Sequence, residues 1–278
     1  MVYAAVLGGG AGTRMQNSGI LRHILQNRAN EAPRQFMSKP TDEKPRQFMS
    51  IPTDELPKQF LPLGDKCILV HTAEQFLDNP QIDKIYVSVP EGWLGHAERL
   101  FGDSPAFGAR SGNMGKLAVV QGRGDRNSTL MAAVGAIEEA HGISQGDIIV
   151  THDAVRPFLT QRIIDENIAE CKKCGAADTV YAMIDTPVIS EDGETVADVP
   201  DRAKYYLSQT PQTFNISLLK EVYASLTAAE KSVMTDACKM FVLKGKTVRI
   251  VAGESYNIKI TTPFDYAAAL AFMSARGA

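Results

Sequence analysis

The 278-residue sequence has few cysteines, no excess of basic residues and no long hydrophobic run. Four cysteines are too few for a disulfide-rich scaffold, and no stretch approaches the ~20 apolar residues of a membrane-spanning helix. Lys and Arg number 29 against 32 Asp and Glu, and a net charge of −3 does not suit a general nucleic-acid-binding protein. The N-terminus lacks the basic region of a signal peptide. We therefore expect a reduced, soluble, cytoplasmic protein with neither nucleic acid nor membrane as a partner.

Cys171 and Cys174 form a single Cys-x-x-Cys pair inside an amphipathic stretch. A zinc site would need a second such pair or two suitably spaced histidines, and a thioredoxin-type site would follow a strand. The sequence therefore favours two ordinary helix cysteines over a metal or redox site.

Short apolar runs alternate with amphipathic stretches along the chain. Strands are predicted at 3–7, 84–89, 117–120, 147–151 and 178–183, and helices at 68–77, 93–101, 128–140 and 161–173. This alternation is typical of an α/β protein whose parallel sheet is covered on both faces. Two β-rich runs around Asp192-Gly193 then predict a hairpin, in an arm over residues 184–208.

The rest of the chain completes the predicted domain. An extended segment at 205–214, helices at 218–224 and 235–243, strands at 247–251 and 258–261 and a closing helix at 263–275 follow the arm. We expect a single domain over residues 1–278.

A tandem repeat interrupts the pattern near the N-terminus. Residues 33–44 and 45–56 match at ten of twelve positions, and 57–68 keeps the initial Pro, basic residue, Gln and Phe. The repeated prolines forbid a continuous helix, and the array is too short for a solenoid. We interpret residues 21–56 as a loop insertion. We expect the third copy to occupy the functional position. The simpler alternative is that the duplication has no function.

The glycine-rich stretch LGGGAGTRM directly follows the first strand. Its glycines allow a close ligand approach and turn N–H groups toward an anion, and Arg14 presents a planar fork for phosphate oxygens. The stretch lacks both the GK[ST] end of a Walker loop and the third glycine of a dinucleotide fingerprint. It favours a phosphate site over a plain strand–helix turn.

Two further charged residues lie where the sheet should place a ligand. Asp153 follows an apolar strand, so it is either a Mg²⁺ ligand beside bound phosphates or a cap of the next element. Lys259 precedes the last helix, and by itself it is more typical of a solvated surface residue.

Together these motifs point to a family. LGGGAGTRM, PKQFLPL, GRGDRNSTL, THDAVRPF, DTPV, QTPQTF, TDA and NIKITTPFD occur in the order seen in nucleotidyltransferases that make CDP-alditols. The chain resembles the 2-C-methyl-D-erythritol 4-phosphate cytidylyltransferases. The wording THDAVRPFLT, QTPQTFN, TDACK and YNIKITTPFD looks closer to the D-ribitol-5-phosphate cytidylyltransferases of teichoic acid or capsule synthesis. Only residues 21–56 fall outside the resemblance.

The resemblance implies a Rossmann-like, mostly parallel sheet of the nucleotidyltransferase (GT-A-like) kind with a β-hairpin arm. It also implies transfer of CMP from CTP to D-ribitol 5-phosphate, with 2-C-methyl-D-erythritol 4-phosphate of isoprenoid synthesis as the alternative acceptor. The implied catalytic cations are Arg14, Lys58 and Lys259, and Mg²⁺ or another divalent cation would bind Asp153. The implied nucleotide-binding residues are Leu7, Gly8, Gly9, Gly10, Gly12, Gly122, Arg126 and Thr129.

The implied acceptor site shares residues between two subunits. Its matching positions are Arg156, Thr186 and Arg202, and an arm contributed by a partner implies a homodimer. The sequence departs from the family at two places. Arg123 stands where relatives have a second glycine, and its side chain would crowd the base. Tyr256 replaces an Asp of the methylerythritol enzymes, which leaves Glu254 as a candidate second metal ligand.

Two other functions remain as alternatives. A non-catalytic nucleotide-binding protein is disfavoured by the retained Arg14, Lys58, Asp153 and Lys259. A glycosyltransferase is disfavoured because no Asp-x-Asp element follows a mid-chain strand.

Overall fold

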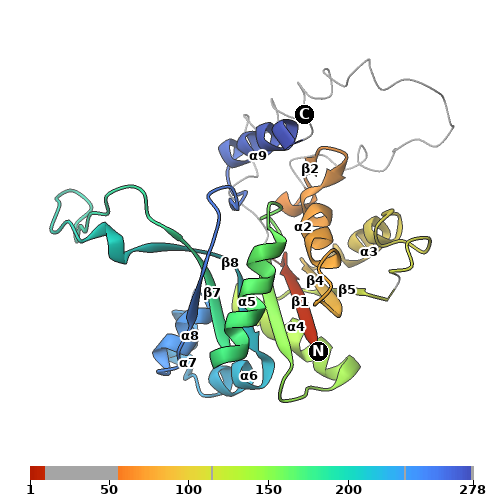
Figure 1. Cartoon of the computed structure of the whole chain (residues 1–278), viewed down its shortest axis with the longest axis horizontal. Helices are drawn as coiled ribbons and strands as arrows, with labels where there is room; N and C mark the ends of the chain where they lie inside the picture. Colours follow the sequence, from red (N-terminus) through yellow and green to blue (C-terminus); the bar gives the residue numbers. More distant parts are fainter. Residues whose placement is uncertain (10–55, 114, 235, 277–278) are drawn as a thin grey trace.

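A seven-stranded sheet forms the centre of the molecule (Figure 1). The computed structural model describes residues 1–9, 56–113, 115–234 and 236–276. The strand order is β5-β4-β1-β6-β8-β7-β9, and β8 alone runs antiparallel to its neighbours. The mostly parallel α/β sheet is therefore confirmed. Its strands are β1 (Val2–Leu7), β4 (Lys84–Val89), β5 (Leu117–Gln121), β6 (Ile148–Asp153), β7 (Ala176–Ala182), β8 (Tyr206–Asn215) and β9 (Arg249–Ala252).

Helices begin and end at residues suited to those positions. The Asp125 carboxylate accepts a hydrogen bond from the Ser128 N–H (2.9 Å) at the start of α4, and Gly175 ends α5 with a φ of 91°. The helices are α2 (Ile68–Leu77), α3 (Leu94–Gly102), α4 (Arg126–His141), α5 (Gln161–Cys174), α6 (Ile216–Ala224), α7 (Ala228–Ser232), α8 (Ala237–Leu243) and α9 (Pro263–Arg276).

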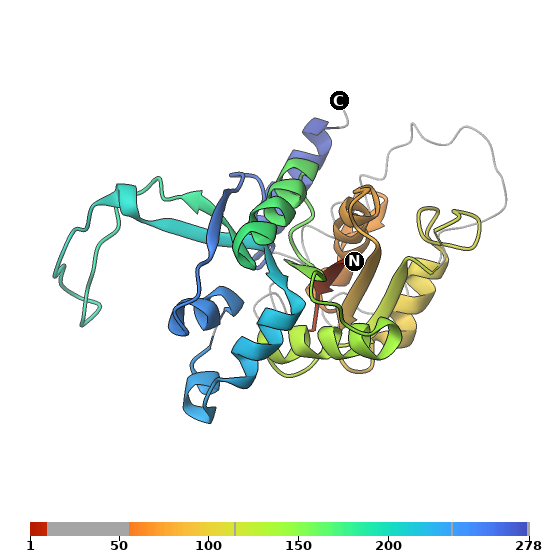
Figure 2. The same cartoon turned by 60° about the horizontal axis from the view of Figure 1, so that its bottom comes forward.

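Strand β1 separates two hydrophobic cores, because successive side chains of a strand point to opposite faces. Ala4 and Val6 pack with α2 and α5, whereas Tyr3 and Ala5 pack with α4 and α6. Figure 2 shows α5 and α4 on opposite sides of the sheet. Burial on both faces explains why the predicted central strands are continuous apolar runs.

A third apolar cluster holds the closing helix against the segment that follows the insertion. Leu61 and Leu63 are buried there with Tyr266 and Leu270 of α9. The short strands β2 (Pro62–Leu63) and β3 (Lys66–Cys67) pair beside this cluster.

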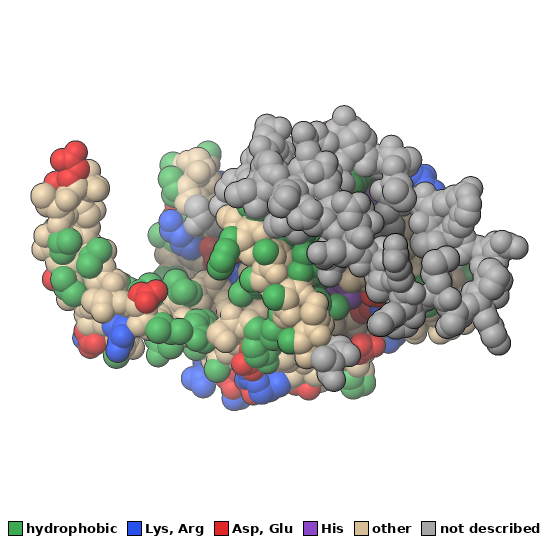
Figure 3. Space-filling model, turned by 90° about the horizontal axis from the view of Figure 1, so that it is seen from above, with side chains coloured by type: hydrophobic (Ala, Val, Ile, Leu, Met, Phe, Trp, Pro, Cys, Tyr) green, Lys and Arg blue, Asp and Glu red, His purple; other side chains and the backbone are tan. Residues whose placement is uncertain are grey.

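The segment from residue 184 to residue 205 forms an arm that extends away from the sheet, whereas residues 206–208 of the predicted arm belong to β8 and pair with β7 (Figures 1 and 3). A single bridge joins Ile189 and Asp198, so the predicted hairpin has a very short ladder. The Asp192 carboxylate closes its tip by accepting hydrogen bonds from two backbone N–H groups (2.8 Å each). Several apolar side chains on the arm are exposed, including Val188 (58%) and Val196 (62%).

The strand predicted at 258–261 is wrong. The segment is irregular, and the Ile260 N–H donates to the Val155 carbonyl (2.9 Å) outside any ladder. Helix α7 was not predicted from the sequence; it is a single short element closed by a Thr227–Glu230 capping box.

Cys171 and Cys174 both lie in α5, as predicted. Burial raises the pKa of Cys171 to about 12, which keeps it a thiol rather than a reactive thiolate. Among the described helices, none is long and apolar enough to span a membrane.

Candidate active site

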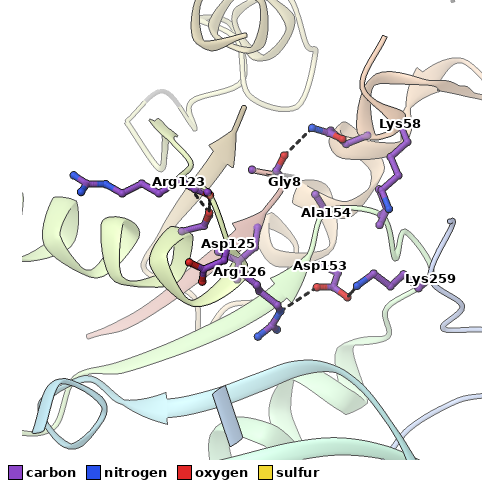
Figure 4. A pocket seen from close by; sticks show the side chains of 14 residues that line it. Gly8, Lys58, Arg123, Asp125, Arg126, Asp153, Ala154 and Lys259 are labelled. Carbon is purple, nitrogen blue, oxygen red and sulfur yellow. Dashed lines mark hydrogen bonds and ion pairs between the residues drawn. The ribbon is translucent and has the colours of Figure 1, made fainter. Parts of the chain in front are cut away.

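The carboxyl ends of the parallel strands meet around a pocket (Figure 4). Leu7 lies opposite Asp153 of β6 and opposite Ser88 of β4, so the glycine turn after β1 is next to both strand ends. The pocket is open to solvent. It is lined by Leu7, Gly8, Gly9, Lys58, Gln59, Arg123, Gly124, Asp125, Arg126, Thr129, Asp153, Ala154, Val155 and Lys259.

The glycines here are required by contacts within the chain. A Cβ on Gly8 would lie 2.7 Å from the Ser88 carbonyl oxygen, and a Cβ on Gly122 would lie 2.6 Å from the Gly9 Cα. The Gly8 N–H also donates to that Ser88 oxygen (2.8 Å). The turns after β1 and β5 therefore pack backbone against backbone, which only glycine permits.

Three residues with implied phosphate roles, Gly10, Gly12 and Arg14, lie outside the described residues. Their roles stay predictions.

Asp153 is the electrostatic centre of the pocket. Its carboxylate lies 3.0 Å from Lys259 Nζ, 3.3 Å from Arg156 Nε and 3.4 Å from Arg126 Nε. Burial would raise the pKa of this carboxyl, but the charges of Arg126, Lys259 and Arg156 outweigh burial and hold the pKa well below its usual range. One carboxylate among three cations leaves a net positive site, which suits a polyphosphate.

The segment after β5 folds into a turn closed by Thr129. The Thr129 hydroxyl donates to the Arg123 carbonyl (2.7 Å) and accepts from the Arg123 N–H (2.9 Å). The Arg123 side chain is exposed and extends away from Asp153 and Lys259 (Figure 4). Arg123 nevertheless belongs to the pocket lining, and its expected crowding of the base stays a prediction. Arg126 lines the pocket and points toward Asp153, and its implied contact with the nucleotide stays a prediction.

The third copy of the repeat contributes residues to the pocket lining, as the sequence analysis predicts for this copy. Lys58 and Gln59 line the pocket from the 3₁₀ turn η1 (Lys58–Phe60), whereas Arg34 and Arg46 of the other copies lie outside the described residues. The Gln59 amide donates to the Gly8 carbonyl (2.7 Å).

The start of α9 positions Lys259. The Asp265 carboxylate accepts from both the N–H and the hydroxyl of Thr261 (2.8 Å each), which fixes the segment just after Lys259. The backbone bond between Ile260 and Val155 ties the same segment to the loop after β6. The lysine is thus held beside Asp153 instead of extending into solvent like an ordinary surface residue.

A buried histidine, which the sequence reading overlooked, lies behind Asp153. Nδ1 of His152 accepts from the Thr210 hydroxyl (2.9 Å), and Nε2 donates to the Arg156 carbonyl (3.0 Å). The Thr210 oxygen accepts from the Asp153 N–H (3.1 Å). Burial lowers the pKa of His152 to about 4, so the neutral ring can donate and accept at once. The sequence does not signal the Thr210–His152 contact, because β8 lies beside β6 only in the folded sheet.

The predicted acceptor-binding residues do not join this pocket within one chain. Arg156 is buried (9% exposed), and its Nη1 donates to the Asn257 carbonyl (2.8 Å), so it supports Asp153 from behind. Its role in acceptor binding stays a prediction. Thr186 and Arg202 lie exposed on the arm, where Arg202 donates to the Ile184 carbonyl (2.7 Å).

The residues present fit a magnesium ion that arrives with a triphosphate. Mg²⁺ commonly binds one or two carboxylates plus substrate phosphates, and Asp153 can supply one. The described residues contain no group of three or more His, Cys, Asp or Glu arranged for a metal. Glu254 is paired with Arg162 (2.6 Å), and Tyr256 stacks on Phe272 (5.3 Å between centroids). Neither residue lines the pocket, and Glu254 as a second metal ligand stays a prediction.

Solved structures share this fold. The synthase of 4-diphosphocytidyl-2C-methyl-D-erythritol from Anaerococcus prevotii has a TM-score of 0.72 at 21% identity, covering 99% of this chain and 96% of that chain. The 2-C-methyl-D-erythritol 4-phosphate cytidylyltransferase of Francisella tularensis has a TM-score of 0.65 at 21% identity (96% and 97%). The enzyme of that name from Thermus thermophilus has a TM-score of 0.61 at 26% identity (78% and 94%).

The sequence itself matches the family model described as IspD, 2-C-methyl-D-erythritol 4-phosphate cytidylyltransferase, over residues 52–275. The match covers most of the chain and begins just before Lys58. The protein therefore belongs to the 2-C-methyl-D-erythritol 4-phosphate cytidylyltransferase family and is a nucleotidyltransferase that uses CTP.

Proposed function

We propose that the protein transfers CMP from CTP to the phosphate group of a short alditol phosphate. An oxygen of the acceptor phosphate attacks the α-phosphorus of CTP, the bond to the bridging oxygen breaks, and pyrophosphate leaves with those electrons. The reaction needs positioning and charge neutralisation rather than covalent catalysis.

The cation cluster around Asp153 is the observation that carries this proposal. Lys259 is partly exposed at the pocket and lies 3.0 Å from Asp153, so it can exchange that carboxylate for phosphate oxygens. Lys58 lines the pocket from another segment. Together they stabilise charge that develops at the α-phosphate, while Arg126 and Arg156 keep Asp153 in place.

The comparisons favour 2-C-methyl-D-erythritol 4-phosphate as the acceptor, because the matched family and the similar structures carry that name. D-ribitol 5-phosphate, expected first from the sequence, is the second candidate. The motif wording and Tyr256 favour it, since this tyrosine packs on Phe272 and offers no carboxylate to the pocket.

Bound Mg²⁺ would neutralise phosphate charge and orient the triphosphate. Asp153 would hold it, and Lys259 would bind the phosphates.

The acceptor site is completed by a partner's arm in a homodimer. Thr186 and Arg202 are exposed on the arm and do not line the pocket of their own chain. Exposed apolar side chains such as Val188 and Val196 suit burial against a second copy. Mixing inactive Lys259→Ala and Arg202→Ala subunits should restore part of the activity, and no restoration would contradict a shared site.

A pyrophosphate-release assay tests the function. CTP should be used with at least one of the two acceptors in the presence of Mg²⁺, with ATP, GTP and UTP much less effective. The acceptor with the higher kcat/KM identifies the substrate. Absence of release with both acceptors, despite CTP binding, would overturn the proposal.

A further inference from the structure

Gln59 is a buried polar residue in the pocket wall to which the reaction assigns no role. It is 1% exposed, and its amide donates to the Gly8 carbonyl over 2.7 Å. The Gly8 N–H is held in turn by the Ser88 carbonyl of β4 (2.8 Å). Gly8 is thus bonded on one side to the sheet and on the other to Gln59.

The segment that carries Gln59 is held in place by its own packing. Phe60 is fully buried and stacks on Trp93 (5.0 Å between centroids), with His96 edge-on (5.1 Å). Leu61 packs in the cluster under α9, and its carbonyl accepts from the Ile68 N–H (3.0 Å) at the start of α2. These contacts all follow the insertion in the chain.

Lys58 and the glycine turn are therefore far apart in the sequence but joined by one side chain. We propose that Gln59 is a positioning residue, whose hydrogen bond to Gly8 sets the place of Lys58 relative to the nucleotide-binding turn. The inference rests on the proposed role of Lys58. The bond directly joins two pocket residues that are 51 positions apart in the sequence.

The expected consequence is kinetic. A displacement of about 1 Å at a charged group can cost roughly 10²-fold in rate, because its stabilisation depends on geometry in the transition state. Gln59→Met keeps the side chain's length and removes the donor. We expect kcat to fall roughly 10- to 100-fold, with a smaller change in the KM for CTP.

A double-mutant cycle tests whether Gln59 acts through Lys58. Turnover is measured for the wild type, Gln59→Met, Lys58→Ala and the double variant, and circular dichroism confirms that each is folded at the assay temperature. If the inference holds, Gln59→Met reduces kcat in the wild type but adds less than about threefold in the Lys58→Ala background. Fully additive effects would overturn it.

Two further variants separate the possible failures. Gln47→Met makes the same change in the second repeat copy and should leave kcat unchanged. Gln59→Glu keeps the size but replaces the donor by an acceptor, so it should impair turnover at least as much as Gln59→Met. If Lys58→Ala is impaired while folded Gln59→Met and Gln59→Glu match the wild type, the Gln59 inference fails alone. If Lys58→Ala turns over normally, the proposed role of Lys58 fails with it.

Discussion

Single residues in the pocket take their character from their neighbours. Lys259 alone resembles a surface lysine, and Asp153 alone resembles a helix cap. In the fold, the end of β6 and the segment before α9 bring these two residues to 3.0 Å. Arg126 and Arg156 add two more cations beside the carboxylate. Their function therefore depends on the cluster of charges around them, and that cluster suits a triphosphate.

Lys259→Ala should lower kcat by at least about 10²-fold, because a preorganised charge at the reacting phosphate is removed. Steady-state pyrophosphate release measures the loss. Lys246→Ala, which removes a surface lysine 3.5 Å from Glu221, is the matched control and should behave like the wild type. Equal turnover of both variants would contradict the role of Lys259.

Asp178 should make stability depend on pH. Burial, together with the Asp236 charge, raises the pKa of its carboxyl to about 6, although Gln212 and Ser208 donate to it. The folded pKa lies above the unfolded value, so the stabilising contribution of the bound proton is complete below about pH 4 and is lost as pH rises through about 6.

Asp178→Asn removes that ionisation. Its stability relative to the wild type should increase by roughly 1–1.5 kcal/mol from pH 5 to pH 8, because about half of the ~3 kcal/mol expected for a shift of about two pKa units is already lost at pH 5. Urea unfolding at both pH values measures the difference. The same pH dependence in both proteins would show that Asp178 does not titrate in this range.

Helices and strands followed sequence patterns closely where one local signal dominated. Helix α2 and strand β4 have the predicted bounds, because apolar spacing and turn residues agree there. The segment 258–261 has alternating apolar residues but no neighbouring strand to pair with, so the pattern misled. The hydrogen bonds from Gln59 to Gly8 and from Thr210 to His152 join residues far apart in the sequence, so no local pattern signals them. For this reason the sequence assigned no role to Gln59 or Thr210.

The turn after β5 gives a sharp test of close packing. Gly122→Ala places a methyl group 2.6 Å from the Gly9 backbone and should destabilise the fold by roughly 1–3 kcal/mol, with reduced CTP binding. Gly124→Ala is the control two residues away, where an added Cβ meets nothing within 4 Å. Thermal unfolding and CTP titration compare the two. Similar behaviour would mean that the turns do not pack as described.

The molecule as a whole combines a family fold with an inserted repeat. The third repeat copy packs into the core and lines the pocket, whereas residues 33–55 of the earlier copies lie outside the described residues. The order of the motifs in the sequence predicted that the third copy lies at the site. It could not show that the Gln59 side chain joins this copy to the glycine turn. The single-domain organisation and the homodimer remain predictions.

Deletion of residues 21–44 should leave turnover within about twofold and thermal stability nearly unchanged. It roughly halves the segment between Gly9 and Leu56, and halving a loop changes its closure free energy by only about 0.6 kcal/mol. Pyrophosphate release and thermal unfolding of the shortened chain measure both. A large loss of turnover with an intact fold would assign the insertion a part in the reaction.

The carboxylate of Asp153 also partly neutralises the cations around it when no ligand is bound. On the proposed mechanism, an arriving triphosphate therefore competes with this carboxylate for Lys259, and Lys259 returns to the carboxylate when pyrophosphate leaves. This competition lowers the affinity for every polyanion. CTP should therefore bind less tightly, and pyrophosphate should dissociate sooner.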